Sequence, residues 1–202
     1  MAELASEPAA RLVLASQSPR RSDLLRSLGL EFEVEPADVD ESRYDGEPAV
    51  DYVVRVARDK AMKVAARHPD ALVVAADTTV ALTPLEILAK PADEHDARSM
   101  LTMLSGRSHL VHTGVALARG PIVESEVETT TVRFNDIDEP TLDWYLATGE
   151  ALDKAGGYAM QGYGGVFVQS IDGSPSNVVG LPLHVVVGLA RRLGVDLARF
   201  RH

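Results

Sequence analysis

Hydrophobic and polar positions along the first part of the chain predict two strands and two helices in alternation. The run Leu12–Ser16 is typical of a short buried strand, and the amphipathic segment from Pro19 to Gly29 predicts a helix directly after it. Phe32–Glu35 is a candidate for a second strand, and Pro36–Glu47 predicts an acidic loop. From Pro48 as far as Ala65, apolar residues recur at the spacing of an amphipathic helix.

The rest of the chain continues this alternation. Ala71–Ala76 is apolar throughout and predicts a buried strand that stops at Asp77. His109–Ala118 and Ile122–Phe134 predict an antiparallel strand pair. The other expected elements are strands at Val80–Leu82, Ile87–Leu88 and Val166–Ile171, helices at Asp93–Leu104, Pro140–Ala147 and Leu183–Leu193, a turn at Thr83–Glu86 and a glycine-rich loop at residues 153–165. The interleaved pattern predicts an α/β fold with a mixed central sheet flanked by helices.

Composition narrows the classes of function. The chain has 202 residues, of which 46% are hydrophobic, so it can build one large domain or two small lobes. Its net charge of −10 argues against nucleic acid as a partner, and an anionic ligand would need a local basic cluster or a metal ion. The absence of cysteine excludes disulfides, zinc thiolate sites and thiol nucleophiles.

The N-terminal residues give no sign of a targeting signal. Residues 1–10 are acidic and lack the basic and apolar regions of a signal peptide. No apolar run approaches the roughly 20 residues that a membrane helix needs. We therefore expect a soluble cytoplasmic protein with no membrane partner, in which residues 1–10 are loosely ordered and residues 11–202 form a single domain.

The junction between the first strand and the first helix is a candidate phosphate site. Ser18 suits the N-cap position and Pro19 the first helical turn. The helix N-terminus then offers N–H groups beside the hydroxyls of Ser16 and Ser18 and the guanidinium groups of Arg20 and Arg21. The alternative is an ordinary capped helix with exposed arginines.

Two carboxylates are candidates for a metal site. Asp77 follows a buried strand, where a carboxylate usually faces a cleft as a metal ligand or general base, or else caps the next turn. Glu41 lies in the acidic loop, which on its own is typical of a solvated surface. If the two converge, they could hold Mg²⁺ or Mn²⁺ together with water and substrate phosphate.

Other polar residues are weaker signals. Lys60 and Lys90 are individually typical of surface lysines, although Pro91 restricts the backbone at Lys90. The glycine-rich loop lacks the Walker signature, but its glycines permit close approach to a ligand, Lys154 offers a cation and Gln161 can read a base edge. His109 and His112 have an odd spacing that places them on opposite faces of one strand, so we expect structural roles for both rather than a shared metal site.

Together these segments resemble the Maf family of nucleoside triphosphate pyrophosphatases. The matching sequences, in order, are LASQSPRR at 14–21, VDE at 39–41, ARDKA at 57–61, AADTTV at 75–80, KP at 90–91, LSGRSH at 104–109, TG at 113–114, DKAGGYAMQG at 153–162 and NVVGLPL at 177–183. The resemblance covers nearly the whole chain after Arg11. It implies an elongated, two-lobed Maf/ITPase-like fold with the active-site cleft between the lobes.

The resemblance also implies an activity and a role for each site residue. The activity is metal-dependent hydrolysis of a nucleoside triphosphate between the α- and β-phosphates. By position, Asp77 is the catalytic base and, with Glu41, a ligand of Mg²⁺ or Mn²⁺. The phosphate contacts are Ser16, Ser18, Arg20, Arg21, Lys60, Lys90 and Lys154. Arg20, Thr78 and Gln161 mark the branch that acts on dTTP and UTP.

Two features depart from the family pattern, and one rival function stays open. The turn Thr83–Glu86 lacks the usual glycine, and Asp59 replaces the usual Glu before Lys60; neither is a catalytic position. The family is associated with division arrest, so the alternative is a non-catalytic nucleotide-sensing inhibitor of septum formation. The resemblance is also compatible with a homodimer.

Overall fold

Within the described part of the chain, the central sheet has seven strands and mixed polarity. A computed structural model describes residues 11–201, so the expectation for residues 1–10 lies outside the described part of the chain. The strand order is β2-β1-β3-β5-β6-β7, and β4 pairs with β3. β2, β1 and β3 are parallel, whereas the remaining pairs are antiparallel. The strands are β1 (Arg11–Leu14), β2 (Glu33–Val34), β3 (Ala71–Ala81), β4 (Ile87–Leu88), β5 (Ser108–Arg119), β6 (Ile122–Phe134) and β7 (Val168–Asp172).

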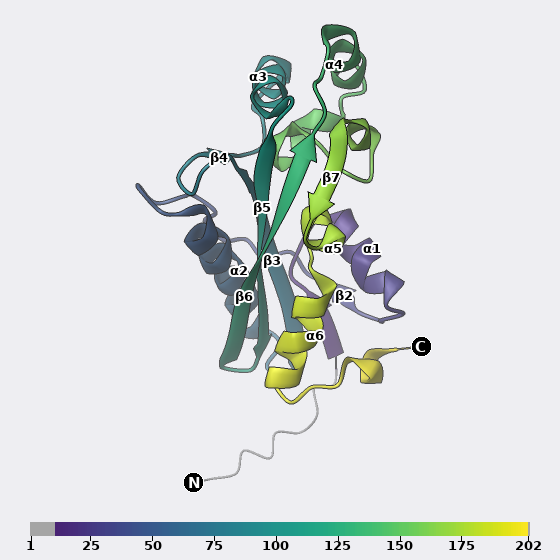
Figure 1. Cartoon of the computed structure of the whole chain (residues 1–202). Helices are drawn as coiled ribbons and strands as arrows, with labels where there is room; N and C mark the ends of the chain where they lie inside the picture. The colour runs from purple at the N-terminus through teal and green to yellow at the C-terminus, as the bar shows by residue number, and fades with distance from the viewer. Residues whose placement is uncertain (1–10, 202) are drawn as a thin grey trace.

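Helices cover both faces of the sheet and its far end. α2 lies on one face, α1, α5 and α6 lie on the other, and α3 and α4 lie at the end of β5 and β6 that is remote from the termini (Figure 1). The helices are α1 (Pro19–Ser27), α2 (Ala49–Ala65), α3 (Glu94–Leu104), α4 (Glu139–Leu146), α5 (Pro175–Val179) and α6 (Leu183–Arg192), with short 3₁₀ helices η1 (Glu150–Asp153), η2 (Ala155–Gly157), η3 (Tyr163–Phe167) and η4 (Leu197–Phe200).

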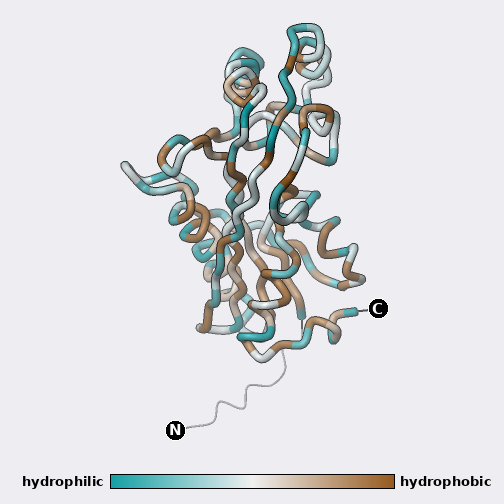
Figure 2. The backbone as a smooth tube through the Cα atoms, viewed as in Figure 1, coloured by the Kyte–Doolittle hydropathy of each residue, from teal (hydrophilic) through white to brown (hydrophobic). Residues whose placement is uncertain are grey.

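Three hydrophobic clusters divide the molecule into two lobes. In the lower lobe, which contains the two ends of the described chain (Arg11 and Arg201), one cluster packs beneath α1 and α6 and another beneath α2. In the upper lobe, a third cluster joins α3, α4 and the ends of β5 and β6. Figure 2 shows hydrophobic stretches along the strands of the lower lobe, between these helices. The mixed sheet and the flanking helices are therefore confirmed.

β3 connects the two lobes and has a free edge between them. β1 pairs with β3 only as far as Leu14 opposite Val74, and β4 pairs with β3 only from Val80 onward. Within the described chain, no strand pairs with residues 75–79 of β3 on this side. Both faces of the sheet therefore open onto one cleft at this position.

Several expected boundaries were wrong. Asp77 does not end a strand: it lies inside β3 and pairs with Gly114 of β5, because the long partner strand continues the hydrogen-bond ladder past the apolar run. The last strand begins at Val168 rather than Val166, since the preceding glycine-rich segment turns through η3. That segment, expected as a loop, contains three 3₁₀ helices, and the short helix α5 was not predicted.

Candidate active site

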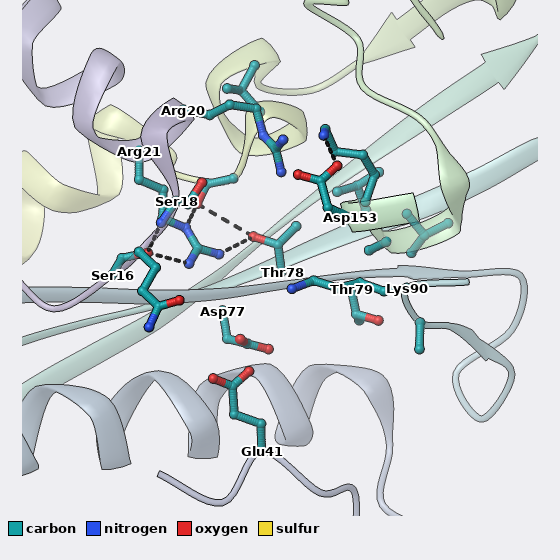
Figure 3. Close-up of a pocket in the computed structure, with 18 of the residues that line it drawn as sticks. Ser16, Ser18, Arg20, Arg21, Glu41, Asp77, Thr78, Thr79, Lys90 and Asp153 are labelled. Atoms are coloured by element: carbon teal, nitrogen blue, oxygen red, sulfur yellow. Dashed lines mark hydrogen bonds and ion pairs between the residues drawn. The ribbon is translucent and has the colours of Figure 1, made fainter. Parts of the chain in front are cut away.

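A cavity of about 980 Å³ lies at the free edge of β3, between the two lobes. Its lower wall is the start of α1, and its upper wall is the glycine-rich segment. Figure 3 shows side chains from both walls pointing into it. Every site residue predicted from the sequence lines this cavity: Ser16, Ser18, Arg20, Arg21, Glu41, Lys60, Asp77, Thr78, Lys90, Lys154 and Gln161.

Asp77, Lys60 and Glu41 form a charged cluster on the α2 face of the sheet. Lys60 Nζ lies 2.8 Å from Asp77 Oδ1 and 3.0 Å from Glu41 Oε1. Asp77 and Lys60 are each 7% exposed, whereas Glu41 is exposed. Burial raises the pKa of Asp77, against the opposing effect of Lys60 and Arg21. A buried carboxyl with a raised pKa beside a single ammonium is an arrangement typical of catalytic bases.

A glycine in β5 allows α2 to deliver Lys60. A Cβ atom on Gly114 would lie 2.3 Å from the backbone oxygen of Val53, so no larger residue fits without displacing the helix. Gly114 pairs directly with Asp77 across the sheet. The close approach of α2 therefore occurs beside the carboxylate that Lys60 contacts.

The acidic loop is held against α2 by contacts that sequence analysis missed. The Tyr52 hydroxyl donates to the backbone oxygen of Glu41 at 3.0 Å. Arg55 donates to both carboxylate oxygens of Glu47, at 2.7 and 2.8 Å, and to the backbone oxygen of Ser42 at 2.9 Å. Burial, followed by the charge of Asp77, raises the pKa of Tyr52 to about 12. The only sequence signal was the position of Arg55 off the apolar stripe of the helix.

The Arg21 guanidinium donates hydrogen bonds to three other groups of the protein. Its nitrogen atoms donate to the Gly180 backbone oxygen at 2.8 Å, to Ser16 Oγ at 3.0 Å and to Thr78 Oγ1 at 3.0 Å. Burial lowers its pKa, and the nearby charge of Asp77 opposes the shift. Arg21 thus joins α1, β3 and the end of α5, while its role as a phosphate contact stays a prediction.

Ser18 occupies the N-cap position of α1, but its side chain makes no capping hydrogen bond, so that part of the expectation was wrong. Instead, the Ser18 backbone N–H donates to Ser16 Oγ at 3.2 Å. The Ser18 hydroxyl belongs to the cavity wall and is available to a ligand there.

Further cations come from both walls. Figure 3 shows Arg20 pointing towards Asp153 and Lys90 reaching into the cavity beside Thr78. Lys154 forms an ion pair with Asp153. Lys90 is exposed and Arg20 is half-buried. The cavity is therefore lined by several cations and by one buried carboxylate, which suits a polyanionic ligand.

Thr78 lies on the opposite face of β3 from Asp77. Its hydroxyl is within 3.0 Å of Thr113 Oγ1 in addition to accepting from Arg21. Gln161 is exposed on the upper wall. The expected specificity residues thus surround one cavity, with Thr78 held in a network and Gln161 accessible to a ligand.

A sequence model described as "Maf-like protein" matches residues 11–193. The chain belongs to the Maf family. A Myxococcus xanthus (strain DK1622) protein named dTTP/UTP pyrophosphatase is 54% identical over 186 residues, covering 92% of this chain and 94% of the relative. An Anaeromyxobacter sp. (strain Fw109-5) protein of the same name is 54% identical over 192 residues, covering 93% and 91%.

One further relative and one solved structure are also similar to this chain. A dTTP/UTP pyrophosphatase from Methylobacillus flagellatus is 46% identical, with 93% of this Maf chain and 94% of the relative covered. A solved HAM1 protein from Coxiella burnetii aligns with a TM-score of 0.42 at 20% identity, covering 61% of this chain and 72% of that one.

The carboxylates of this Maf protein fit the divalent metal that the family implies. Within residues 11–201, no group of three or more acidic or histidine side chains is arranged to hold a metal ion. Mg²⁺, however, is commonly bound through one or two carboxylates, with substrate phosphates and water completing its shell. Asp77 and Glu41 both contact the Lys60 ammonium group, so two such carboxylates lie near each other in the cavity.

The two histidines have the structural roles that were expected. His109 Nε2 lies 2.8 Å from the Tyr158 hydroxyl, and His112 Nδ1 lies 2.8 Å from Thr129 Oγ1. Burial lowers the pKa of both. In addition, no helix within residues 11–201 has the length and apolar character needed to cross a membrane.

Proposed function

We propose that the protein hydrolyses dTTP and UTP to the nucleoside monophosphate and pyrophosphate. The observation that carries the proposal is the buried Asp77–Lys60 pair in a cavity that Arg20 and Lys90 also line. A triphosphate is a chain of negative charges with one reacting phosphorus atom, and this arrangement matches it. Relatives that are 46–54% identical are named dTTP/UTP pyrophosphatase, which supports both the proposed reaction and the proposed pyrimidine nucleobase.

Asp77 is the base in the proposed mechanism. Its carboxylate accepts a proton from water as that water attacks the α-phosphorus, and pyrophosphate leaves with the electrons of the broken P–O bond. A pKa raised by burial makes the carboxylate a stronger proton acceptor than an exposed aspartate. No covalent phosphoenzyme is required.

The cations hold the triphosphate in place. Lys60 contacts Asp77 and Glu41 in the free protein, and an arriving phosphate competes with these carboxylates for its ammonium group. Arg20 and Lys90 line the same cavity, and we assign them to the leaving pyrophosphate. A divalent cation held by Asp77 and Glu41 would supply further neutralisation of the phosphate charge.

Base selection is proposed to fall to the upper wall. The Gln161 amide can both donate and accept, so it can pair with the N3–H donor and O4 acceptor of uracil or thymine. Cytosine presents an amine and a bare acceptor at these positions, so an amide held in the orientation that suits uracil would face like groups on cytosine. We also propose that the reaction takes place in the cytoplasm.

A pyrophosphate-release assay with UTP, dTTP, CTP, ATP and GTP tests the proposal. With Mn²⁺ or Mg²⁺ we expect the highest kcat/KM for UTP and dTTP, and loss of activity when a chelator removes the metal. Similar kcat/KM for all five nucleotides would contradict the base preference. Tight nucleotide binding with no pyrophosphate release under any metal condition would contradict the enzyme and favour the nucleotide-sensing alternative.

A further inference from the structure

The upper wall of the cavity is a loop that is closed at its base by one side chain. Residues 150–164 include the cavity residues Asp153, Lys154 and Gln161. Glu150 Oε2 accepts a hydrogen bond from the Tyr163 backbone N–H at 2.9 Å, and Oε1 accepts from the Gly164 backbone N–H, also at 2.9 Å. The two ends of the loop are therefore joined through a single carboxylate.

The chain is packed closely around this carboxylate. A Cβ atom on Gly162 would lie 2.0 Å from Glu150 Oε2, so the segment next to Gln161 approaches the carboxylate more closely than any other residue would allow. The buried Tyr145 hydroxyl lies 3.3 Å from Glu150 Oε1 and 3.0 Å from the Gly157 backbone oxygen. Tyr145 thus links the carboxylate to the middle of the same loop.

These contacts constrain Gln161 without touching the cavity. Gln161 lies one residue before Gly162 and two before Tyr163, so the Glu150 hydrogen bonds fix the backbone immediately after it. Glu150 itself does not line the cavity. A side chain that reads hydrogen bonds on a base discriminates well only if its backbone is held in one position beforehand.

We propose that Glu150 is a positioning residue for base selection: its carboxylate closes the 150–164 loop and thereby sets the Gln161 amide against the pyrimidine edge. This inference rests on the proposed function. Both carboxylate oxygens are needed, because a glutamine at this position would direct its NH₂ group at a backbone N–H donor. The expected effect is on selectivity and KM, since the loop contributes no base and no nucleophile to the reaction.

Glu150→Gln, Glu150→Ala and Tyr145→Phe test this role, with Glu139→Gln as the matched control. Glu139 lies on α4 in the same lobe, is paired with Arg98 at the surface and does not line the cavity. For Glu150→Gln we expect the UTP-to-CTP ratio of kcat/KM to fall about tenfold, mainly through KM for UTP, with kcat changed less than about threefold. Tyr145→Phe keeps the two hydrogen bonds from the backbone to the Glu150 carboxylate, so we expect a smaller fall in the UTP-to-CTP ratio for this variant.

Amide hydrogen exchange over residues 158–164 gives a second readout without turnover. Faster exchange in Glu150→Gln together with lost selectivity supports the proposal. Faster exchange with an unchanged UTP-to-CTP ratio would overturn it, because the carboxylate would then act on structure alone. A wild-type protein without preference for UTP would overturn the proposed base specificity, and that result is recognisable before any variant is made. If Glu150→Ala does not fold, the other two variants decide the question.

Discussion

Acidification from about pH 7 to about pH 5 should lower the free energy of unfolding by about 2 kcal/mol through His109 alone. The His109 ring is 2% exposed and is in edge contact with Phe134 and Tyr158, with ring centroids 4.8 and 5.5 Å away. Its Nδ1 atom has no hydrogen-bond partner in the described chain. A charged imidazolium would be poorly solvated in this position.

The size of this loss in the free energy of unfolding follows from the pKa shift of His109. Burial lowers the pKa of His109 from 6.5 to about 4. Because the folded pKa lies below the unfolded one, the unfolded chain takes up the proton first, and stability is lost as the pH falls from 6.5 towards 4. At about pH 5 the unfolded histidine is almost fully protonated and the folded one almost fully neutral, which gives the figure of about 2 kcal/mol.

Urea unfolding at the two pH values, for wild type and His109→Gln, measures this loss. Glutamine retains a polar group near the Tyr158 hydroxyl but does not titrate. His112, whose pKa is also lowered by burial, is present in both proteins, so its contribution cancels in the comparison. We expect the pH-dependent loss to be about 2 kcal/mol smaller in the variant. Equal losses in the two proteins would refute the assigned cause.

Two further predictions concern the charged cluster and the close approach of α2. Asp77→Asn should reduce kcat by about 10²–10⁴-fold in the pyrophosphate-release assay, whereas Asp51→Asn at the exposed start of α2 should not; near-normal turnover in the first variant would exclude Asp77 as the base. Gly114→Ala should lower the thermal midpoint, because the clash of the new Cβ with the Val53 backbone lowers the free energy of unfolding by roughly 1–3 kcal/mol. Gly188→Ala in α6, where a Cβ would meet nothing within 4 Å, should raise the midpoint. An unchanged midpoint in Gly114→Ala would show that α2 can shift at little cost.

Local pattern predicted most of the fold because the main elements have clean periodicity. The apolar stripe of α2 specifies a helix with one buried face, and the alternation in β6 specifies a strand. The pattern failed at Asp77, where the strand continues through polar residues because β5 pairs with it along its length. It also failed in residues 150–167, where glycine conformations and the Glu150 carboxylate replace periodicity as the determinants of structure.

The candidate site was predictable in membership but not in geometry. The eleven site residues predicted from the motif resemblance all line one cavity. The resemblance could not show that Lys60 bridges Asp77 and Glu41, or that Arg21 donates hydrogen bonds to Ser16 and Thr78. Those partners depend on packing between segments far apart in sequence. The same is true of Tyr52 and Arg55, whose contacts hold the acidic loop in place.

The free edge of β3 explains why neighbouring residues can take different tasks in one cavity. Because side chains alternate along a strand, Asp77 points to the α2 face of the sheet, where it contacts Lys60. Thr78 points to the opposite face, where Arg21 and Gly180 lie. In the interior of a sheet these two side chains would face separate compartments. Here β1 has ended and β4 has not begun, so a ligand lying across the edge can meet both faces at once. Under the proposed function, the catalytic base Asp77 and the expected specificity residue Thr78 are consecutive residues of one rigid strand, which fixes the distance between them, while Gln161 faces the same cavity from the upper wall.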